Sequence, residues 1–256
     1  MDGRKILVIL LAWNEAEGLP GILGEIRAQL PGVDTLVVDD GSTDRTAEVA
    51  AAAGSAVARL PYNLGVGGAM RLGYRYAHLH GYDVAIQIDS DGQHDPSYVP
   101  LLLEKLNEAD LVIGARFDGE GDYKVRGPRK WAMGLLSTVL SRITRTRLTD
   151  TTSGFRACNR KLIEFFATWY PVEYLGDTVE SMVGAARCGF TVRQVPVAMR
   201  ERTTGRPSAS PFKAMIYLAR AGLVLLLAMI RRMPDNLRAI AESKDDSPVR
   251  ELALKS

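Results

Sequence analysis

The sequence predicts an α/β protein in which helices flank a mostly parallel central sheet. In the first half of the chain, short β-rich runs alternate with helical patterns, and this alternation favours a parallel sheet. The first of these runs, Ile6 to Leu11, is continuously apolar, which is typical of a strand buried on both faces. The chain has 256 residues, of which 46% are hydrophobic, and this is enough to bury a full core.

The elements of the first half follow from the spacing of its apolar residues. After the first strand, apolar residues recur at helical spacing from Leu19 to Leu30, and a Pro-Gly pair closes that helix. Further strands are expected at residues 35–38, 56–60, 84–88 and 111–115. The remaining features are an alanine-rich helix at 44–53 and a glycine-rich loop at 63–68 that leads into another helix.

Past residue 116 the regular alternation stops. Residues 117–130 contain several glycines and mixed charges, which indicate a long loop of the kind that often acts as a lid. The elements expected after it are a helix at 131–143, a strand near Phe155, a helix at 177–188 and a strand at 191–199. We divide the chain into one domain at 1–212 with halves at 1–116 and 117–212, an apolar helical appendage at 213–232 and a loosely ordered polar tail at 233–256.

The composition excludes several classes of protein. The formal net charge is +2, from 32 basic and 30 acidic residues, so we expect no nucleic-acid partner. The two cysteines fit no metal-ligand spacing and favour a reducing compartment. The first apolar run is too short for a signal peptide, and the run Ala221 to Ile230 is too short to cross a bilayer. We therefore expect a cytoplasmic protein, either soluble or peripheral at the cytoplasmic face of the membrane.

The strongest chemical signal is the segment Asp89-Ser90-Asp91-Gly92-Gln93-His94, which directly follows an expected strand. Ligands of open α/β sheets collect at the carboxyl ends of strands. Alternation along an extended chain turns Asp89 and Asp91 to the same side, where two carboxylates can bind one Mg²⁺ or Mn²⁺, and Gln93 adds a neutral oxygen. The alternative is an acidic turn without a ligand.

A second acidic segment, Asp39-Asp40-Gly41-Ser42-Thr43-Asp44, also follows an apolar strand and opens a helix. Gly41 suits a turn, and Ser42 or Thr43 suits a helix cap, so these residues need no ligand. The adjacent acids Asp39 and Asp40 remain unexplained by that view. A carboxylate here can accept hydrogen bonds from the N–H of a base or from ribose hydroxyls.

The third signal is the glycine-rich segment Asn63 to Ala69, followed by Arg71 on the next helix. Gly65 and Gly67 allow the backbone to approach a ligand closely, and the start of a helix favours anions. The segment is neither a dinucleotide fingerprint nor a P-loop. A tight turn without a ligand is the alternative.

Together with Trp13-Asn14-Glu15, these three segments resemble the family 2 glycosyltransferases in order and spacing. The later segments Asp150-Thr151-Thr152-Ser153-Gly154-Phe155-Arg156, Val195-Pro196-Val197 and Glu201-Arg202 resemble the polyprenol- and dolichol-phosphate sugar synthase branch. The resemblance covers about residues 5 to 215. It implies the Rossmann-like GT-A fold, with the nucleotide in the first half and the acceptor in the second.

The resemblance also implies roles for individual residues. Trp13, Glu15 and Asp39 are expected to hold the nucleoside, with Asp39 on the base. Asp89, Asp91 and Gln93 are expected to hold the metal and the diphosphate. The basic residues expected to neutralise phosphates are Arg116, Arg129 and Arg202, with Arg126 or Lys130 as alternatives to Arg129. The nucleotide-sugar site is further expected to include Asp40, Gly65, Gly67, Arg71 and Ser90.

The reaction implied by the resemblance is an inverting, metal-dependent transfer of a hexose from a GDP- or UDP-sugar to polyprenyl phosphate. A hydroxyl acceptor on a soluble small molecule is the alternative, and it needs a general base such as Asp177 or Glu180, which a helix places on one face. A non-catalytic nucleotide-sugar-binding module is the alternative from another class. The apolar helix is expected to lie on a membrane surface, on the catalytic domain or on a second subunit of a homo-oligomer.

Overall fold

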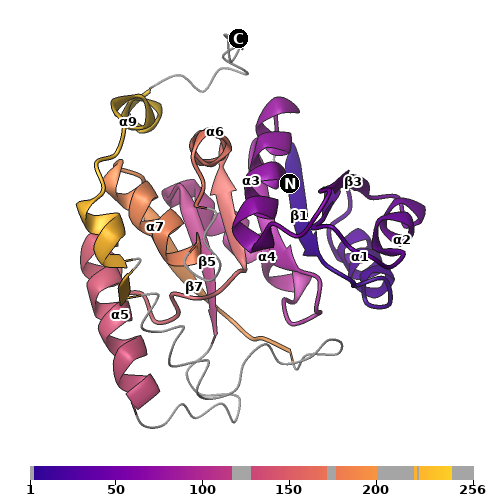
Figure 1. The fold of residues 1–256 in the computed structure, drawn as a ribbon, viewed down its shortest axis with the longest axis horizontal. Helices are drawn as coiled ribbons and strands as arrows, with labels where there is room; N and C mark the ends of the chain where they lie inside the picture. Colours follow the sequence, from indigo (N-terminus) through magenta and orange to yellow (C-terminus); the bar gives the residue numbers. More distant parts are fainter. Residues whose placement is uncertain (1–2, 117–127, 172–176, 201–221, 224, 244–256) are drawn as a thin grey trace.

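A computed structural model describes residues 3–116, 128–171, 177–200, 222–223 and 225–243, with backbone alone at 116 and 128–133. Its described part contains one seven-stranded sheet in the order β3-β2-β1-β4-β6-β5-β7 (Figure 1). The strands are β1 Ile6–Ala12, β2 Asp34–Asp39, β3 Ala56–Arg59, β4 Val84–Asp89, β5 Leu111–Arg116, β6 Arg156–Asn159 and β7 Val192–Val197. Only β6 runs antiparallel to its neighbours, so the prediction of a mostly parallel sheet is confirmed.

Helices cover both faces of this sheet (Figure 1). They are α1 Leu19–Gln29, α2 Thr46–Ala52, α3 Gly65–Leu79, α4 Val99–Lys105, α5 Pro128–Thr144, α6 Arg160–Thr168, α7 Asp177–Arg187 and α9 Asp235–Glu242, with short 3₁₀ turns at Pro96–Tyr98 and Leu106–Glu108. Alternate residues of β1 enter different cores, because side chains alternate along a strand. Leu7 and Ile9 pack with α3, α5, α6 and α7, whereas Val8 and Leu10 pack with α1 and α4.

The sequence predictions were wrong at three places. The glycine-rich segment is not a loop up to Gly68, because α3 already begins at Gly65. The short helices α4 and α6 were not predicted at all. The tail expected from residue 233 is helical at α9, where Met233 and Leu237 are buried against the core. A helix so short and polar is ordered by the few apolar residues that it buries, since short helices gain most of their stability from packing.

The C-terminal appendage has an inner and an outer face. Leu225 and Ala228 are buried in the core, and the Arg187 guanidinium donates hydrogen bonds to the carbonyls of Ala228 and Arg231. Along the outer face the exposed side chains are Leu223, Leu226, Leu227 and Ile230. In the described residues, no helix combines the length and apolarity that crossing a bilayer demands.

Close packing of α3 on β1 predicts a large effect for Gly73→Ala. A Cβ atom at Gly73 would lie 2.7 Å from Cγ2 of Ile9, a buried, β-branched side chain that cannot swing away. Overpacking of this kind costs about 1–3 kcal/mol and outweighs the roughly 1 kcal/mol gained in helix propensity. We therefore expect urea denaturation to show a lower free energy of unfolding.

The matched control is Gly24→Ala on α1. An added Cβ there would meet no atom of the described chain within 4 Å. This variant should gain up to about 1 kcal/mol of stability from helix propensity. Equal stability changes in the two variants would contradict the close packing of α3 on β1.

Candidate active site

Three neighbouring strands bring the predicted motifs to one edge of the sheet. In the parallel register, Ala12 of β1 lies beside Asp39 of β2, and Leu11 of β1 lies beside Asp89 of β4. Trp13 follows directly after β1, and its side chain is exposed. The carboxyl ends of β1, β2 and β4 therefore meet at the edge where ligands of such sheets bind.

The loops after β1 and β2 are joined by hydrogen bonds. The Ser42 hydroxyl accepts from the Asn14 amide at 2.9 Å, and the Asn14 side-chain oxygen accepts from the Thr43 amide at 2.9 Å. The Glu15 amide donates to the Thr46 hydroxyl at 2.9 Å. The prediction that Ser42 or Thr43 caps the next helix was wrong, because both residues hold the Asn14 loop and α2 starts only at Thr46.

Asp39 is fully buried, and its two carboxylate oxygens have different surroundings. Oδ1 accepts from the Ser42 amide at 2.9 Å. Oδ2 lies 3.2 Å from Nε of Arg59, but within the described part of the chain it accepts no hydrogen bond. Buried polar atoms rarely stay unsatisfied, because each costs about 1–3 kcal/mol. Asp39 thus holds one oxygen ready for a hydrogen-bond donor that binds at this edge.

Asp40, by contrast, is occupied inside the protein. Its two carboxylate oxygens accept from the backbone amides of Leu64 at 2.7 Å and Gly65 at 2.8 Å, at the start of α3. Burial raises the pKa of Asp40, and these two amides oppose that rise. Asp40 therefore supplies the negative charge that a helix N-terminus favours. Its expected role in nucleotide binding stays a prediction.

The glycines beside Asp40 serve this packing. Gly41 has a φ of +72°, and a Cβ there would lie 2.5 Å from the Tyr62 backbone carbon, so the turn must be glycine. Gly65 has a φ of +78°, and Gly67 is buried in the first turn of α3. Arg71 is exposed on the same helix. The predicted contacts of Gly65, Gly67 and Arg71 with a nucleotide remain predictions.

The loop after β4 is fixed from several sides. The amide of Asp89 donates to Nδ1 of His94 at 3.0 Å, and the buried His94 ring stacks on Phe155 with centroids 5.1 Å apart. An Oδ1 atom of Asp91 accepts from the Gln93 amide at 3.0 Å. Gly154 lies so close that a Cβ there would be 3.1 Å from both Asp89 carboxylate oxygens. The roles of His94 and Gly154 were not predicted from the sequence motifs that contain them.

The donor set of this loop fits a hard divalent cation. Asp89 is partly exposed, whereas Ser90 and Asp91 are buried beside it. In the part of the chain that the structure describes, no cluster of three or more His, Cys, Asp or Glu side chains forms a complete protein cage. Mg²⁺ is commonly held by one or two carboxylates together with substrate phosphates, so two aspartates and Gln93 are sufficient ligands.

The two candidate bases lie in different environments. Asp177 at the start of α7 is 4% exposed. Burial raises its pKa to about 6, the charge of Asp89 adds to the rise, and the Arg156 guanidinium opposes it. Glu180 instead forms an ion pair with Arg231 at 3.1 Å. Asp177 thus interacts electrostatically with Asp89 at the end of β4.

Arg156 was named in the sequence motif without a role, and the structure shows it buried. Its Nε donates to the Ser153 carbonyl at 2.9 Å, and its Nη1 and Nη2 donate to Ser181 Oγ at 3.2 Å and the Thr178 carbonyl at 3.3 Å. It joins the Ser153 turn to α7. The signal for it was an arginine directly before the apolar pair Ala157 and Cys158.

The predicted phosphate-binding arginines are described least. Arg116 is the last residue of β5, and Arg129 lies in the first turn of α5, both without described side chains. Arg202 and most of the predicted 117–130 loop lie outside the described residues. Their roles stay predictions.

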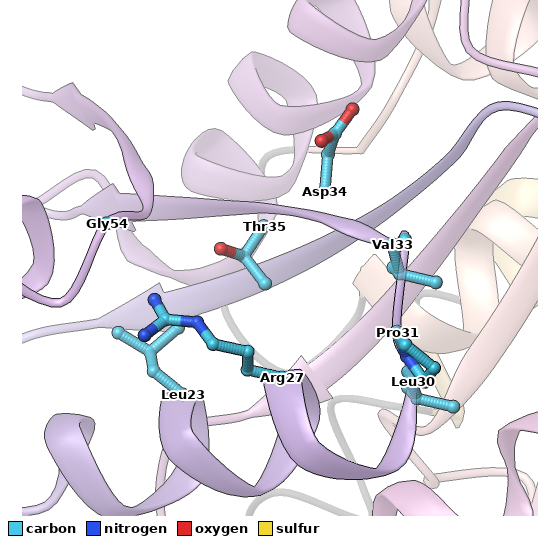
Figure 2. A pocket seen from close by; sticks show the side chains of 9 residues that line it. Leu23, Arg27, Leu30, Pro31, Val33, Asp34, Thr35 and Gly54 are labelled. Atoms are coloured by element: carbon cyan, nitrogen blue, oxygen red, sulfur yellow. The ribbon is translucent and has the colours of Figure 1, made fainter.

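A hollow of about 330 Å³ lies at the opposite, amino edge of β2 (Figure 2). It is lined by Leu23, Arg27, Leu30, Pro31, Gly32, Val33, Asp34, Thr35 and Gly54. The Arg27 guanidinium there donates to the Ala53 carbonyl. None of the predicted site residues line this hollow, so the motifs point to the carboxyl edge instead.

Comparison with known proteins gives consistent matches. The glycosyl transferase family 2 profile matches residues 7–166. An undecaprenyl-phosphate mannosyltransferase of Micrococcus luteus is 36% identical over 219 residues, covering 80% of this chain and 88% of that protein. A polyprenol monophosphomannose synthase of Mycolicibacterium smegmatis is 31% identical over 212 residues, covering 79% and 80%.

Solved structures show the same fold. Glucosyl-3-phosphoglycerate synthase from Mycobacterium tuberculosis, in complex with Mn²⁺, UDP and its product, superposes with a TM-score of 0.69 at 23% identity, covering 90% of this chain and 82% of that one. The same enzyme with Mg²⁺ and UDP gives a TM-score of 0.68 at 23% identity, covering 90% and 81%. The GT-A fold implied by the motifs is therefore confirmed.

The raised pKa of Asp177 predicts a pH-dependent effect for Asp177→Asn. The folded protein holds the Asp177 proton up to about pH 6, whereas the unfolded chain releases it near the ordinary value of 3.8. Wild-type stability from this group therefore falls as pH rises between these values. The asparagine variant lacks this fall, so it should gain about 2 kcal/mol on the wild type between pH 4.5 and pH 7.5.

Urea denaturation of both proteins at pH 4.5, 6.0 and 7.5 measures this effect. Effects of the substitution that do not involve ionisation change the free energy of unfolding equally at all three pH values. Only the part of the difference that varies with pH therefore reports on Asp177. Stability curves that stay parallel across the three pH values would show that Asp177 ionises normally.

Proposed function

Since this chain belongs to glycosyl transferase family 2 and is a glycosyltransferase, we propose that it transfers a hexose from a GDP- or UDP-sugar to polyprenyl phosphate. The observation that carries the proposal is the arrangement at the carboxyl edge. There, Asp39 presents an unsatisfied oxygen while Asp89 and Asp91 present carboxylates two strands away. One end of the site suits a nucleobase, and the other suits a metal-bound diphosphate.

The donor is oriented by contacts from both loops. Oδ2 of Asp39 is an acceptor, and uracil and guanine each offer a ring N–H to it. The exposed Trp13 indole lies on the adjacent loop, where it can cover the nucleoside. Nε of Arg59 lies 3.2 Å from Oδ2 of Asp39 and places a positive charge beside this carboxylate. These contacts hold the nucleotide without selecting between the two bases.

Asp89, Asp91 and Gln93 would hold Mg²⁺ or Mn²⁺. When bound, the cation neutralises the charge that develops on the departing nucleoside diphosphate. The chain itself contributes a loop that is held by His94 and approached closely by Gly154, and both contacts limit the movement of Asp89. The acceptor then attacks the anomeric carbon from the face opposite the diphosphate, with inversion.

A polyprenyl phosphate acceptor fits the relatives and the basic residues. Relatives named for undecaprenyl phosphate and polyprenol share 36% and 31% identity with this chain. An acceptor phosphate is already anionic, so it requires cations rather than a base, and Arg116, Arg129 and Arg202 are the proposed ones. A hydroxyl acceptor is the second candidate. It is favoured by the burial of Asp177 and by a pKa of about 6, which suits a general base near neutral pH.

The C-terminal appendage supports a membrane location for the acceptor. Leu223, Leu226, Leu227 and Ile230 recur at helical spacing on its exposed face. Arg232 follows this face and is exposed, where it can meet anionic headgroups. Contact with a second subunit is the alternative use of this face. We propose peripheral association with the cytoplasmic membrane surface.

The central experiment is a transfer assay. The full chain is incubated with Mn²⁺ or Mg²⁺, a panel of GDP- and UDP-sugars, and a short polyprenyl phosphate, and products are identified by mass spectrometry. We expect a glycolipid that requires the metal and falls by at least about 100-fold in Asp91→Ala, since metal stabilisation is worth several kcal/mol.

Asp34→Ala at the amino edge of β2 is the matched control and should keep full activity. Hydrolysis of the donor without a glycolipid would move the acceptor to a hydroxyl compound and make Asp177 the base to test. The proposed function would be overturned by a wild-type chain that binds no nucleotide-sugar with metal present.

Two adjacent aspartates give a sharper test of the nucleotide contact. Asp39→Asn keeps an oxygen for the Ser42 amide but replaces the unsatisfied oxygen with an NH₂ group, which cannot accept from a base. A hydrogen bond to a charged group contributes about 1.5–3 kcal/mol, so the nucleotide Kd should rise about 10- to 100-fold by calorimetry.

Asp40→Asn should behave differently. It removes one of two acceptors at the start of α3, so we expect about 1 kcal/mol lower stability and little change in nucleotide affinity. Equal losses of affinity in the two variants would count against Asp39 as the base ligand.

A further inference from the structure

The chain that leaves β7 is bonded to the loop that carries the proposed metal ligands. His94 and Met199 form an antiparallel bridge, and the Arg200 amide donates to the Gln93 carbonyl at 3.0 Å. On its other side, the Gln93 amide donates to Asp91 Oδ1 at 3.0 Å. Gln93 thus accepts a backbone hydrogen bond from Arg200 through its carbonyl and donates one to the Asp91 carboxylate through its amide.

The Arg200 side chain fixes this contact from two further elements. Its Nη1 donates to both carboxylate oxygens of Glu25 on α1, each at 2.8 Å. Its Nη2 lies 2.9 Å from Asp95 Oδ2, and its Nε donates to the same oxygen at 3.2 Å. One planar guanidinium therefore connects α1, the end of the metal loop and the end of β7.

The geometry of the Arg200 guanidinium constrains both of its acidic partners, Glu25 and Asp95. A guanidinium has donors in a rigid fork, so it fixes the orientation of its partners as well as their distance.

The ion pairs of Arg200 with Glu25 and Asp95 contribute little to the free energy of folding, because the three side chains are 21–40% exposed. The members of this cluster are instead close in sequence to proposed functional residues. Asp95 lies two residues after Gln93, and Arg200 lies two residues before Arg202. The position of the cluster connects the donor-binding half of the protein to the start of the segment that carries a proposed acceptor-side cation.

We propose that Arg200 is a positioning residue that holds the Gln93 loop, and through it the Asp91 carboxylate, in the geometry that binds the metal–nucleotide complex. The proposal rests on the proposed function. Neither Arg200, Glu25 nor Asp95 touches the metal. Loss of the guanidinium leaves the backbone bond from Arg200 in place but frees it to move, so metal binding weakens without unfolding of the protein.

The test uses the full chain and measures Mn²⁺ binding by electron paramagnetic resonance in the presence of UDP or GDP. Arg200→Gln should raise the apparent Kd for Mn²⁺ about tenfold. Arg200→Lys, which keeps the charge without the fork, should recover part of that loss. Thermal midpoints of both variants should stay close to that of the wild type.

The matched control is Arg160→Gln. Arg160 pairs with Asp83 at a similar exposure, but at the amino ends of β4 and α6, far along the strand from Asp89. Removing it should leave Mn²⁺ binding unchanged. As a second readout, amide hydrogen exchange of the metal-free protein should speed up at residues 89–95 in Arg200→Gln and not in Arg160→Gln.

Unchanged Mn²⁺ binding in Arg200→Gln, or a loss no greater than in Arg160→Gln, would overturn the positioning role alone. Unchanged amide hydrogen exchange at residues 89–95 in Arg200→Gln would also overturn the positioning role. A wild-type chain that binds neither nucleotide with Mn²⁺ would overturn the proposed function first, and the positioning role with it.

Discussion

The pairing of β1 with β2 on one side and β4 on the other is the constraint on which the site depends. All three strands are parallel and buried, so their carboxyl ends stop at the same edge, about 5 Å apart from strand to strand. A shift of one residue in either register would turn Asp39 or Asp89 to the opposite face. The apolar side chains of β2 and β4 oppose such a shift, because a slipped strand would move each of them to the other core. The site is therefore positioned by hydrophobic burial, although it is itself polar.

At that edge, some aspartates use their oxygens in hydrogen bonds within the protein, and another keeps an oxygen available to accept from a ligand. Asp40 is satisfied by two amides of α3, and Asp44 accepts from the amides of Thr46 and Ala16. Asp39 is the exception, with a buried oxygen that accepts nothing from the described chain. Asp39 and Asp40 are thus adjacent but differ in role. The difference is that backbone amides donate to both oxygens of Asp40 and to only one oxygen of Asp39.

This contrast shows how far sequence could predict the structure. Apolar runs and their spacing predicted the parallel strands of the first half and the edge where the motifs meet, since those patterns follow from burial alone. They did not predict α4 or α6, because segments of seven and nine residues show too few turns for a clear period. Nor did they separate Asp39 from Asp40 or Asp177 from Glu180. Those distinctions depend on partners such as Leu64 and Arg231, which lie far away in sequence.

The antiparallel strand β6 explains why the two halves of the chain form one site. It lies between β4 and β5, so the Ser153–Phe155 turn that precedes it runs beside the carboxyl end of β4. Gly154 can then approach the Asp89 carboxylate, and Arg156 reaches α7 beside Asp177. A parallel strand in this place would have ended at that edge, and would have brought the residues after it, rather than the Ser153–Phe155 turn before it, to the end of β4. By reversing one strand, the fold brings residues from the second half of the chain against Asp89, a proposed metal ligand from the first half. The buried Arg156 charge offsets the cost of placing Asp177 and Asp89 close together.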